Sequence, residues 1–167
     1  MRLLLICFLI FPALAQAQNL RESLIGKWAG DGSVQIRPTS KAKSTKCNAR
    51  FSQVEGFWLG GSLSCKKGRQ RDLVQLRFAT PDTRGRMKVD LFDDDGDMLV
   101  SLAGQLSDQQ LTLYHPDILE FGGTEYQPVL MFSVGRNNQF QLQQLGVPTR
   151  SDVSHYTMSD ILFDRIK

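Results

Sequence analysis

Apolar and polar residues alternate along most of the chain in short runs, which is the pattern of half-buried β-strands. In residues 24–38 the even-numbered positions from Trp28 to Ile36 are apolar or glycine, and the odd-numbered positions are mostly polar. A short amphipathic segment, residues 19–25, precedes this run. We therefore expect a brief helix that plugs one end of the structure, followed by a strand that leads away from it.

Further strands are expected along the rest of the chain. The same alternation predicts them at residues 45–54, 57–66, 72–79, 86–92, 98–105, 110–115, 124–134, 139–145 and 153–166. Turn-forming sequences separate many of them, such as DDDGD at residues 93–97 and GRNN at residues 135–138. Residues 116–123 are expected to form a longer loop.

This arrangement predicts an all-β fold. About ten consecutive strands joined mainly by tight turns favour a single antiparallel up-and-down β-barrel of about 8–10 strands, with a short N-terminal helix, because closure removes exposed strand edges. An open sandwich is the structural alternative. No repeat or linker divides residues 18–167, and about 150 residues suit a single domain.

Residues 1–17 have the form of a secretory signal peptide. Arg2 precedes an apolar run too short to span a membrane, and small residues surround Ala17, where cleavage is expected. Cys7 lies inside the apolar run and not at the cleavage point, which argues against a lipid anchor. We expect a soluble periplasmic or secreted monomer without a membrane anchor. The formal net charge of +3 does not point to nucleic acid or to an anionic membrane.

Export makes a disulfide the favoured state of Cys47 and Cys65. If the two residues lie opposite each other in a hairpin, the residue midway between them is Gly56, where a tight turn is needed. Cys47 shares its parity with Phe51, and Cys65 shares its parity with Leu59, so both thiols are expected on the apolar side.

A family resemblance rests on residues 26–32. Gly26, Trp28, Gly30 and Gly32 form the pattern G-x-W-x-G-x-G after a short helical lead. This resembles the calycin superfamily of lipocalins and fatty-acid-binding proteins, and it is also similar to the nitrobindin family of small barrels. The resemblance implies that Trp28 closes one barrel end, that the glycines let the strand bend, and that the interior holds a hydrophobic ligand.

Two histidines are candidate ligand contacts together with Trp28. The nitrobindin resemblance implies haem held by a late histidine, for which His155 is the candidate; a surface or locally hydrogen-bonded histidine is the alternative. His115 ends an alternating run and is expected to point inward, where it would fix the polar end of a ligand or lie satisfied at a barrel rim. Two histidines cannot form a centre of several imidazoles, and no Cys/His spacing matches a zinc site.

Other chemistry finds little support in the sequence. The aspartates of residues 93–97 suggest weak divalent binding, but EF-hand spacing would place ligands at Leu91 and Leu102, so a solvated hairpin turn is favoured. No G-x-S-x-G elbow is present and nothing local activates a hydroxyl, so we expect no catalysis. The paired glycines at 60–61 and 122–123 lack the helix and lysine of a phosphate-binding loop.

Two functional hypotheses follow. In the first, the barrel binds a small apolar molecule without chemical turnover. In the second, large side chains fill the barrel and its surface acts as an envelope interaction module or inhibitor. The contact would then lie in the loop of residues 116–123, or at the basic hairpin end formed by residues 41–50 and 66–71. Haem binding is a weaker third reading.

Overall fold

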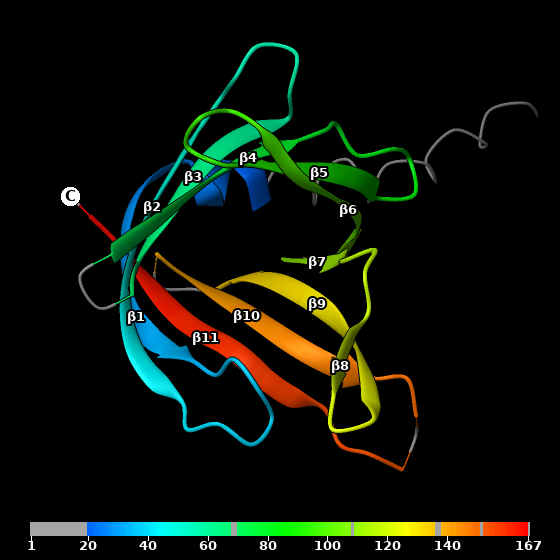
Figure 1. Cartoon of the computed structure of the whole chain (residues 1–167). Helices are drawn as coiled ribbons and strands as arrows, with labels where there is room; N and C mark the ends of the chain where they lie inside the picture. The colour runs from blue at the N-terminus through cyan, green and yellow to red at the C-terminus, as the bar shows by residue number, and fades with distance from the viewer. Residues whose placement is uncertain (1–19, 68–69, 108, 136–137, 151, 167) are drawn as a thin grey trace, which may run out of the picture.

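The computed structural model describes residues 20–67, 70–107, 109–135, 138–150 and 152–166. A helix at residues 20–24 precedes a series of β-strands (Figure 1). The strands are β1 (Gly26–Val34), β2 (Lys43–Ser52), β3 (Leu59–Lys67), β4 (Gln70–Phe78), β5 (Arg86–Phe92), β6 (Met98–Ser107), β7 (Gln110–Tyr114), β8 (Leu119–Phe121), β9 (Thr124–Val134), β10 (Gln139–Pro148) and β11 (Tyr156–Arg165).

The described strands form a closed antiparallel barrel of ten strands, as the sequence predicts. Consecutive strands pair from β1 to β7 and from β9 to β11, β7 pairs with β9, and β11 returns to pair with β1. β8 stands outside the ring and pairs with β9 alone. The architecture is therefore a small barrel consistent with a calycin-like fold, and the open-sandwich alternative is wrong.

The strand predictions are accurate in most of the chain. β5 and β9 have the predicted bounds, and the other strands differ by a few residues. β8 was expected to be loop, and His115 lies just beyond the end of β7. The last strand begins at Tyr156, so His155 precedes it. The expected signal peptide lies outside the described residues. Among the described residues no helix is long and apolar enough to cross a bilayer.

The cysteine hairpin is confirmed. Cys47 and Cys65 are direct partners in the β2–β3 ladder, their Cα atoms are 4.0 Å apart, and a disulfide joins them. Gly56 lies in the connecting turn with a φ of 77°, a conformation that glycine adopts without steric cost. The Cys47 side chain is 2% exposed and belongs to the core, as predicted from its parity.

One half of the barrel, which we call the helix half, is filled by side chains. The helix supplies the buried leucines Leu20 and Leu24. Six aromatic residues with at most 3% exposure join them: Trp28, Phe51, Phe78, Phe132, Phe140 and Phe163. Their rings contact one another edge-on or stacked, and such geometries add to the free energy gained by burial. The helix half is therefore a packed core.

The glycine-tryptophan motif on β1 packs against the helix in this half. The Trp28 indole Nε1 donates a hydrogen bond to the Leu24 carbonyl at 2.8 Å, which ties β1 to the helix. The Arg165 guanidinium lies 4.6 Å from the centre of the Trp28 ring and donates to the Ser23 carbonyl. A side chain at Gly30 would meet the Phe163 ring, with its Cβ only 2.6 Å from a ring carbon. The motif therefore closes the barrel end.

Simple alternation fails to identify the interior at three positions. In a strand over residues 98–105 Met98 would share a face with Val100, but a register shift pairs Met98 with Phe92 on the outer face, and Met98 is 61% exposed. Ile36 lies beyond the end of β1 and is exposed. Phe57 lies in the β2–β3 connection near Arg77, whereas Trp58 is buried against Phe78.

Candidate functional site

The opposite half of the barrel, which we call the mouth, has inward apolar side chains that are only partly buried. Directly paired residues on neighbouring strands share a face of the sheet. Leu63 pairs with Val74 and Leu91 pairs with Val100, in phase with core residues of the same strands, so all four face inward. These four side chains and Leu130 are only partly buried. All but Val74 pack against the core, and all keep part of their surface exposed at this end of the barrel. Below it, Leu76, Leu102, Leu113, Leu142 and Ile161 are buried and form its floor.

The mouth has an apolar wall and a polar wall. The apolar wall consists of Leu63, Val74, Leu91, Val100 and Leu130, from β3, β4, β5, β6 and β9. The polar wall consists of Thr45, Gln144, Tyr156 and Ser159, from β2, β10 and β11. Thr45 and Ser159 are buried, and the Thr45 hydroxyl donates a hydrogen bond to the Lys66 carbonyl at 3.0 Å. Strand β1 lies between β11 and β2, so its inward residue Val34 lies between the β11 and β2 residues of the polar wall. A surface of this kind suits a mainly apolar molecule that carries a few polar atoms.

Gln144 differs from the other glutamines of β10. Gln139 donates to Asp164, and Gln141 and Gln143 donate to Asp160, all on the outer face of β11. Gln144 instead pairs with Leu130 and with Ser159, which place it on the inner face. Within the described residues, no hydrogen bond joins its side chain to another group. Its amide is therefore free to bond water or a ligand.

The strand register shifts directly beside this glutamine. The pairing of β10 with β11 is irregular between Gln144 and Leu145, where Met158 is the extra residue on β11. Such bulges re-aim side chains and are frequent at barrel rims and near functional sites. This bulge changes the parity of β11, so that both Ser159 and Tyr156 face inward.

Tyr156 belongs to an aromatic cluster at the rim. Its ring centre is 5.0 Å from that of Tyr126 and 6.2 Å from that of Phe121. Its ring covers Gly146, where a Cβ would clash with it. The Tyr156 hydroxyl is buried and has no hydrogen-bond partner among the described residues. Burial, and after it the neighbouring Tyr126, raises the pKa of this phenol, which keeps it a proton donor.

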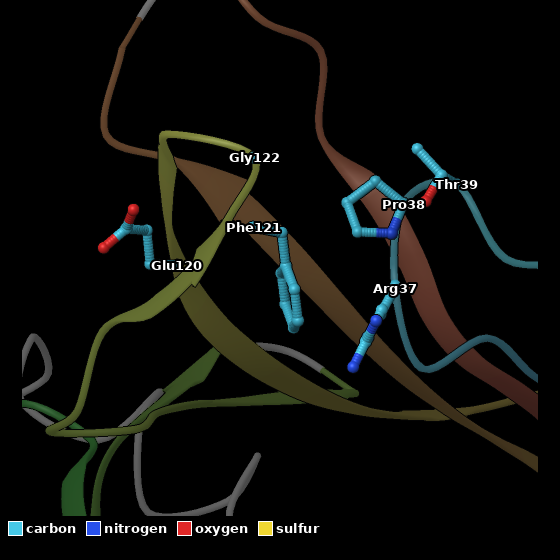
Figure 2. A pocket seen from close by; sticks show the side chains of 6 residues that line it. All are labelled: Arg37, Pro38, Thr39, Glu120, Phe121 and Gly122. Atoms are coloured by element: carbon cyan, nitrogen blue, oxygen red, sulfur yellow. The ribbon is translucent and has the colours of Figure 1, made fainter.

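A pocket of about 410 Å³ lies beside this cluster, between two loops at the rim (Figure 2). Arg37, Pro38 and Thr39 form one wall. The β8–β9 hairpin forms the other wall with Glu120, Phe121 and Gly122. In Figure 2 the Arg37 side chain and the Phe121 ring extend in the same direction, and Glu120 points away. The Phe121 ring thus lines this pocket and also contacts Tyr156.

Local hydrogen bonds shape both pocket walls. The Gln35 amide donates to the carbonyls of Arg37 and Pro38, and the Arg37 N–H donates to the Ser40 hydroxyl. The opposite hairpin turns through Gly122 and Gly123, whose φ values of 59° and 76° match a two-residue hairpin turn. The loops are therefore preformed, and Figure 1 shows them together at the end of the barrel away from the helix.

The predicted ligand contacts are not brought together. Trp28 is 1% exposed and packs under the helix in the other half. His155 is exposed, before β11. His115 accepts a hydrogen bond at Nδ1 from the Asp117 N–H at 3.0 Å, and its side chain is 29% exposed. His115 therefore lies at the barrel rim with its Nδ1 hydrogen-bonded, which was the alternative to ligand contact. Its Nε2 has no partner among the described residues.

The aspartate sequence forms the β5–β6 turn. The Asp97 N–H donates to an Asp93 carboxylate oxygen, and the Gly96 N–H donates to the Asp93 carbonyl. In the described part of the chain, no three His, Cys, Asp or Glu side chains are grouped as a metal site would require.

The expected basic hairpin end is partly described. Lys43 pairs with Val34 at the rim, and the Lys46 Nζ lies 3.8 Å from the Asp31 Oδ1 on the outer face.

No protein-family model and no curated protein matches this sequence. The likeness to calycins therefore rests on the barrel and on the motif around Trp28.

The sequence pattern did not identify Gln144 and Tyr156 as residues of the barrel interior. The available signal was the pair Gln143-Gln144, where two polar residues in succession interrupt the alternation of β10.

Proposed function

We propose that this protein is an exported, non-enzymatic binding protein that holds a small, mainly apolar molecule in the mouth of its barrel. The observation that carries the proposal is that inward apolar side chains such as Leu91 and Val100 keep part of their surface exposed at the mouth, beside the amide of Gln144, which is unpaired among the described residues. Covering such surface stabilises a complex by about 25 cal/mol per Å². The packed helix half supplies a rigid floor.

The proposal includes export because the protein contains a disulfide. Disulfides persist in oxidising compartments, and Cys47–Cys65 fixes two strands that line the mouth. Haem is not part of the proposal, because His155 is exposed and His115 lies at the rim. A visible spectrum of the purified protein tests that choice: a Soret band lost on His155→Ala would overturn it.

Fluorescence titration with Nile red tests the binding proposal. We expect saturable binding near one molecule per chain, and we expect Val100→Trp to weaken it at least tenfold because the indole fills the mouth. Ala103→Trp is the matched control, since this position on the same strand faces outward and is exposed. Equal binding by the two variants, or no saturable binding, would contradict the proposal.

A second candidate function is protein interaction through the rim. It is favoured by two adjacent exposed apolar side chains at the start of β6, Met98 at 61% and Leu99 at 57%. Contiguous exposed apolar surface is common at interaction sites. Cross-linking in envelope extracts tests it: a product lost with Met98→Ser/Leu99→Ser but kept with Leu162→Ser supports the rim contact, and equal products contradict it.

A further inference from the structure

The polar wall indicates the chemical class of the bound molecule, and this inference rests on the proposed function. We propose that the ligand is an uncharged amphiphile whose hydroxyl or carbonyl group hydrogen-bonds to Gln144 and Tyr156, with its apolar body against the opposite wall. Both side chains face the mouth and lack a protein partner among the described residues.

Gln144 is the accessible part of this site. Its amide can both donate and accept, so it can bind either a hydroxyl or a carbonyl. A partly exposed, unpaired amide beside Leu130 and Ser159 gives this side of the mouth directional contacts that the apolar wall lacks. A ligand with no polar atom would leave the amide unpaired, so it would bind more weakly.

Tyr156 supplies a second contact, behind Phe121. A buried hydroxyl without a partner costs free energy, and a ligand oxygen that accepts its proton would remove that cost. Phe121 packs edge-on against Tyr156 and lines the rim pocket, so the ligand reaches the hydroxyl when this ring shifts. The ring sits on β8, which is three residues long and pairs with β9 alone.

The charges around the mouth favour an uncharged group. At the rim, the outermost inward positions on β2 and β4 carry Lys43 and Asp72, which are exposed and opposite in sign. Arg37 and Glu120 both border the rim pocket, but Arg37 extends in the same direction as the Phe121 ring whereas Glu120 points away (Figure 2). Beside Gln144 and Tyr156 the inward neighbours are uncharged: Leu130, Ser159 and Gly146. A carboxylate placed there would lose its hydration without gaining a cation.

Calorimetric titration of the oxidised protein with decan-1-ol and with decanoate at pH 7.5 tests this inference. We expect decan-1-ol to bind at least tenfold more tightly. We expect Gln144→Leu and Tyr156→Phe each to weaken decan-1-ol binding about fivefold to tenfold, the usual effect of one lost hydrogen bond. Gln143→Leu, one residue away on the outer face, and Tyr114→Phe, an exposed tyrosine, are the matched controls and should bind as the unaltered protein does.

The outcomes separate this inference from the proposed function. Tighter binding of decanoate, above all if Arg37→Gln abolishes it, would overturn the uncharged class. Equal decan-1-ol affinity in Gln144→Leu and Gln143→Leu would overturn the polar contact. In both cases saturable Nile red binding would still support a ligand-binding barrel, whereas its absence would overturn the proposed function itself. Thermal unfolding of each variant shows that a loss of affinity does not come from loss of the fold.

Discussion

The two halves of this barrel are built from the same ten described strands and have different interiors. The helix half contains six buried aromatic residues and a helix fastened by Trp28 and Arg165. The mouth contains aliphatic side chains, a polar wall, loops and the rim cluster of Phe121, Tyr126 and Tyr156. The aromatic rings of the mouth lie at its rim, whereas those of the helix half contact one another across the barrel interior. The helix half thus stabilises the fold, and the mouth is the end that we propose for ligand binding.

Truncation of core side chains should expose this contrast most strongly. We expect Phe140→Ala in the helix half to lower the free energy of unfolding by about 3–5 kcal/mol, through lost burial and an unfilled cavity. Leu91→Ala in the mouth should cost about 1 kcal/mol, because its side chain is already partly hydrated. Chemical denaturation measures both. Equal costs would mean that the two halves are packed alike.

The disulfide should stabilise the fold where packing is weaker. Replacing both Cys47 and Cys65 by alanine removes a cross-link between residues 18 apart in sequence. We expect about 3 kcal/mol of lost stability, because the unfolded chain regains the freedom of that loop. Denaturation with and without a reductant measures it: the reductant should lower the stability of the unaltered protein and leave the double variant unchanged. A cost below about 1 kcal/mol would contradict this role.

The closure of the helix end depends on a smaller contact. Arg165→Met removes the cation above Trp28 and the hydrogen bond to the Ser23 carbonyl. We expect a loss of about 1–2 kcal/mol, measured by thermal unfolding. Lys46→Met is the control, since its ion pair with Asp31 is highly exposed and should contribute less than about 0.5 kcal/mol. A similar loss for both variants would show that Arg165 does not fasten the helix.

The smallest predicted effect has the opposite sign and concerns the mouth. Tyr156→Phe removes a buried hydroxyl that lacks a partner, so we expect the ligand-free protein to gain up to about 1 kcal/mol of stability. Tyr114→Phe should leave stability unchanged, because Tyr114 is 46% exposed. Chemical denaturation compares them. A loss above about 1 kcal/mol for Tyr156→Phe would mean that its hydroxyl already makes a stabilising bond.

The sequence predicts the barrel well because alternation reports directly on burial. Cys47 and Cys65 are correctly opposed, and Trp28 is buried beside the expected N-terminal helix. The errors occur where the period of two is interrupted. One extra residue in β6 turns Met98 outward, and β8, with three residues, is too short to show an alternating pattern. The mouth was harder to predict because its polar residues, Gln144 among them, depart from the pattern that identifies a strand interior.

The central claim is that the mouth, and not the helix half or the outer surface, receives a small apolar molecule. Amide chemical shifts measured by NMR during titration with decan-1-ol test it most directly. We expect saturable shifts at Val74, Leu91, Val100 and Gln144, with Leu59 and Phe163 unaffected. Shifts confined to outward positions such as Leu162 and Ala103, or shifts centred on the helix half, would contradict the account.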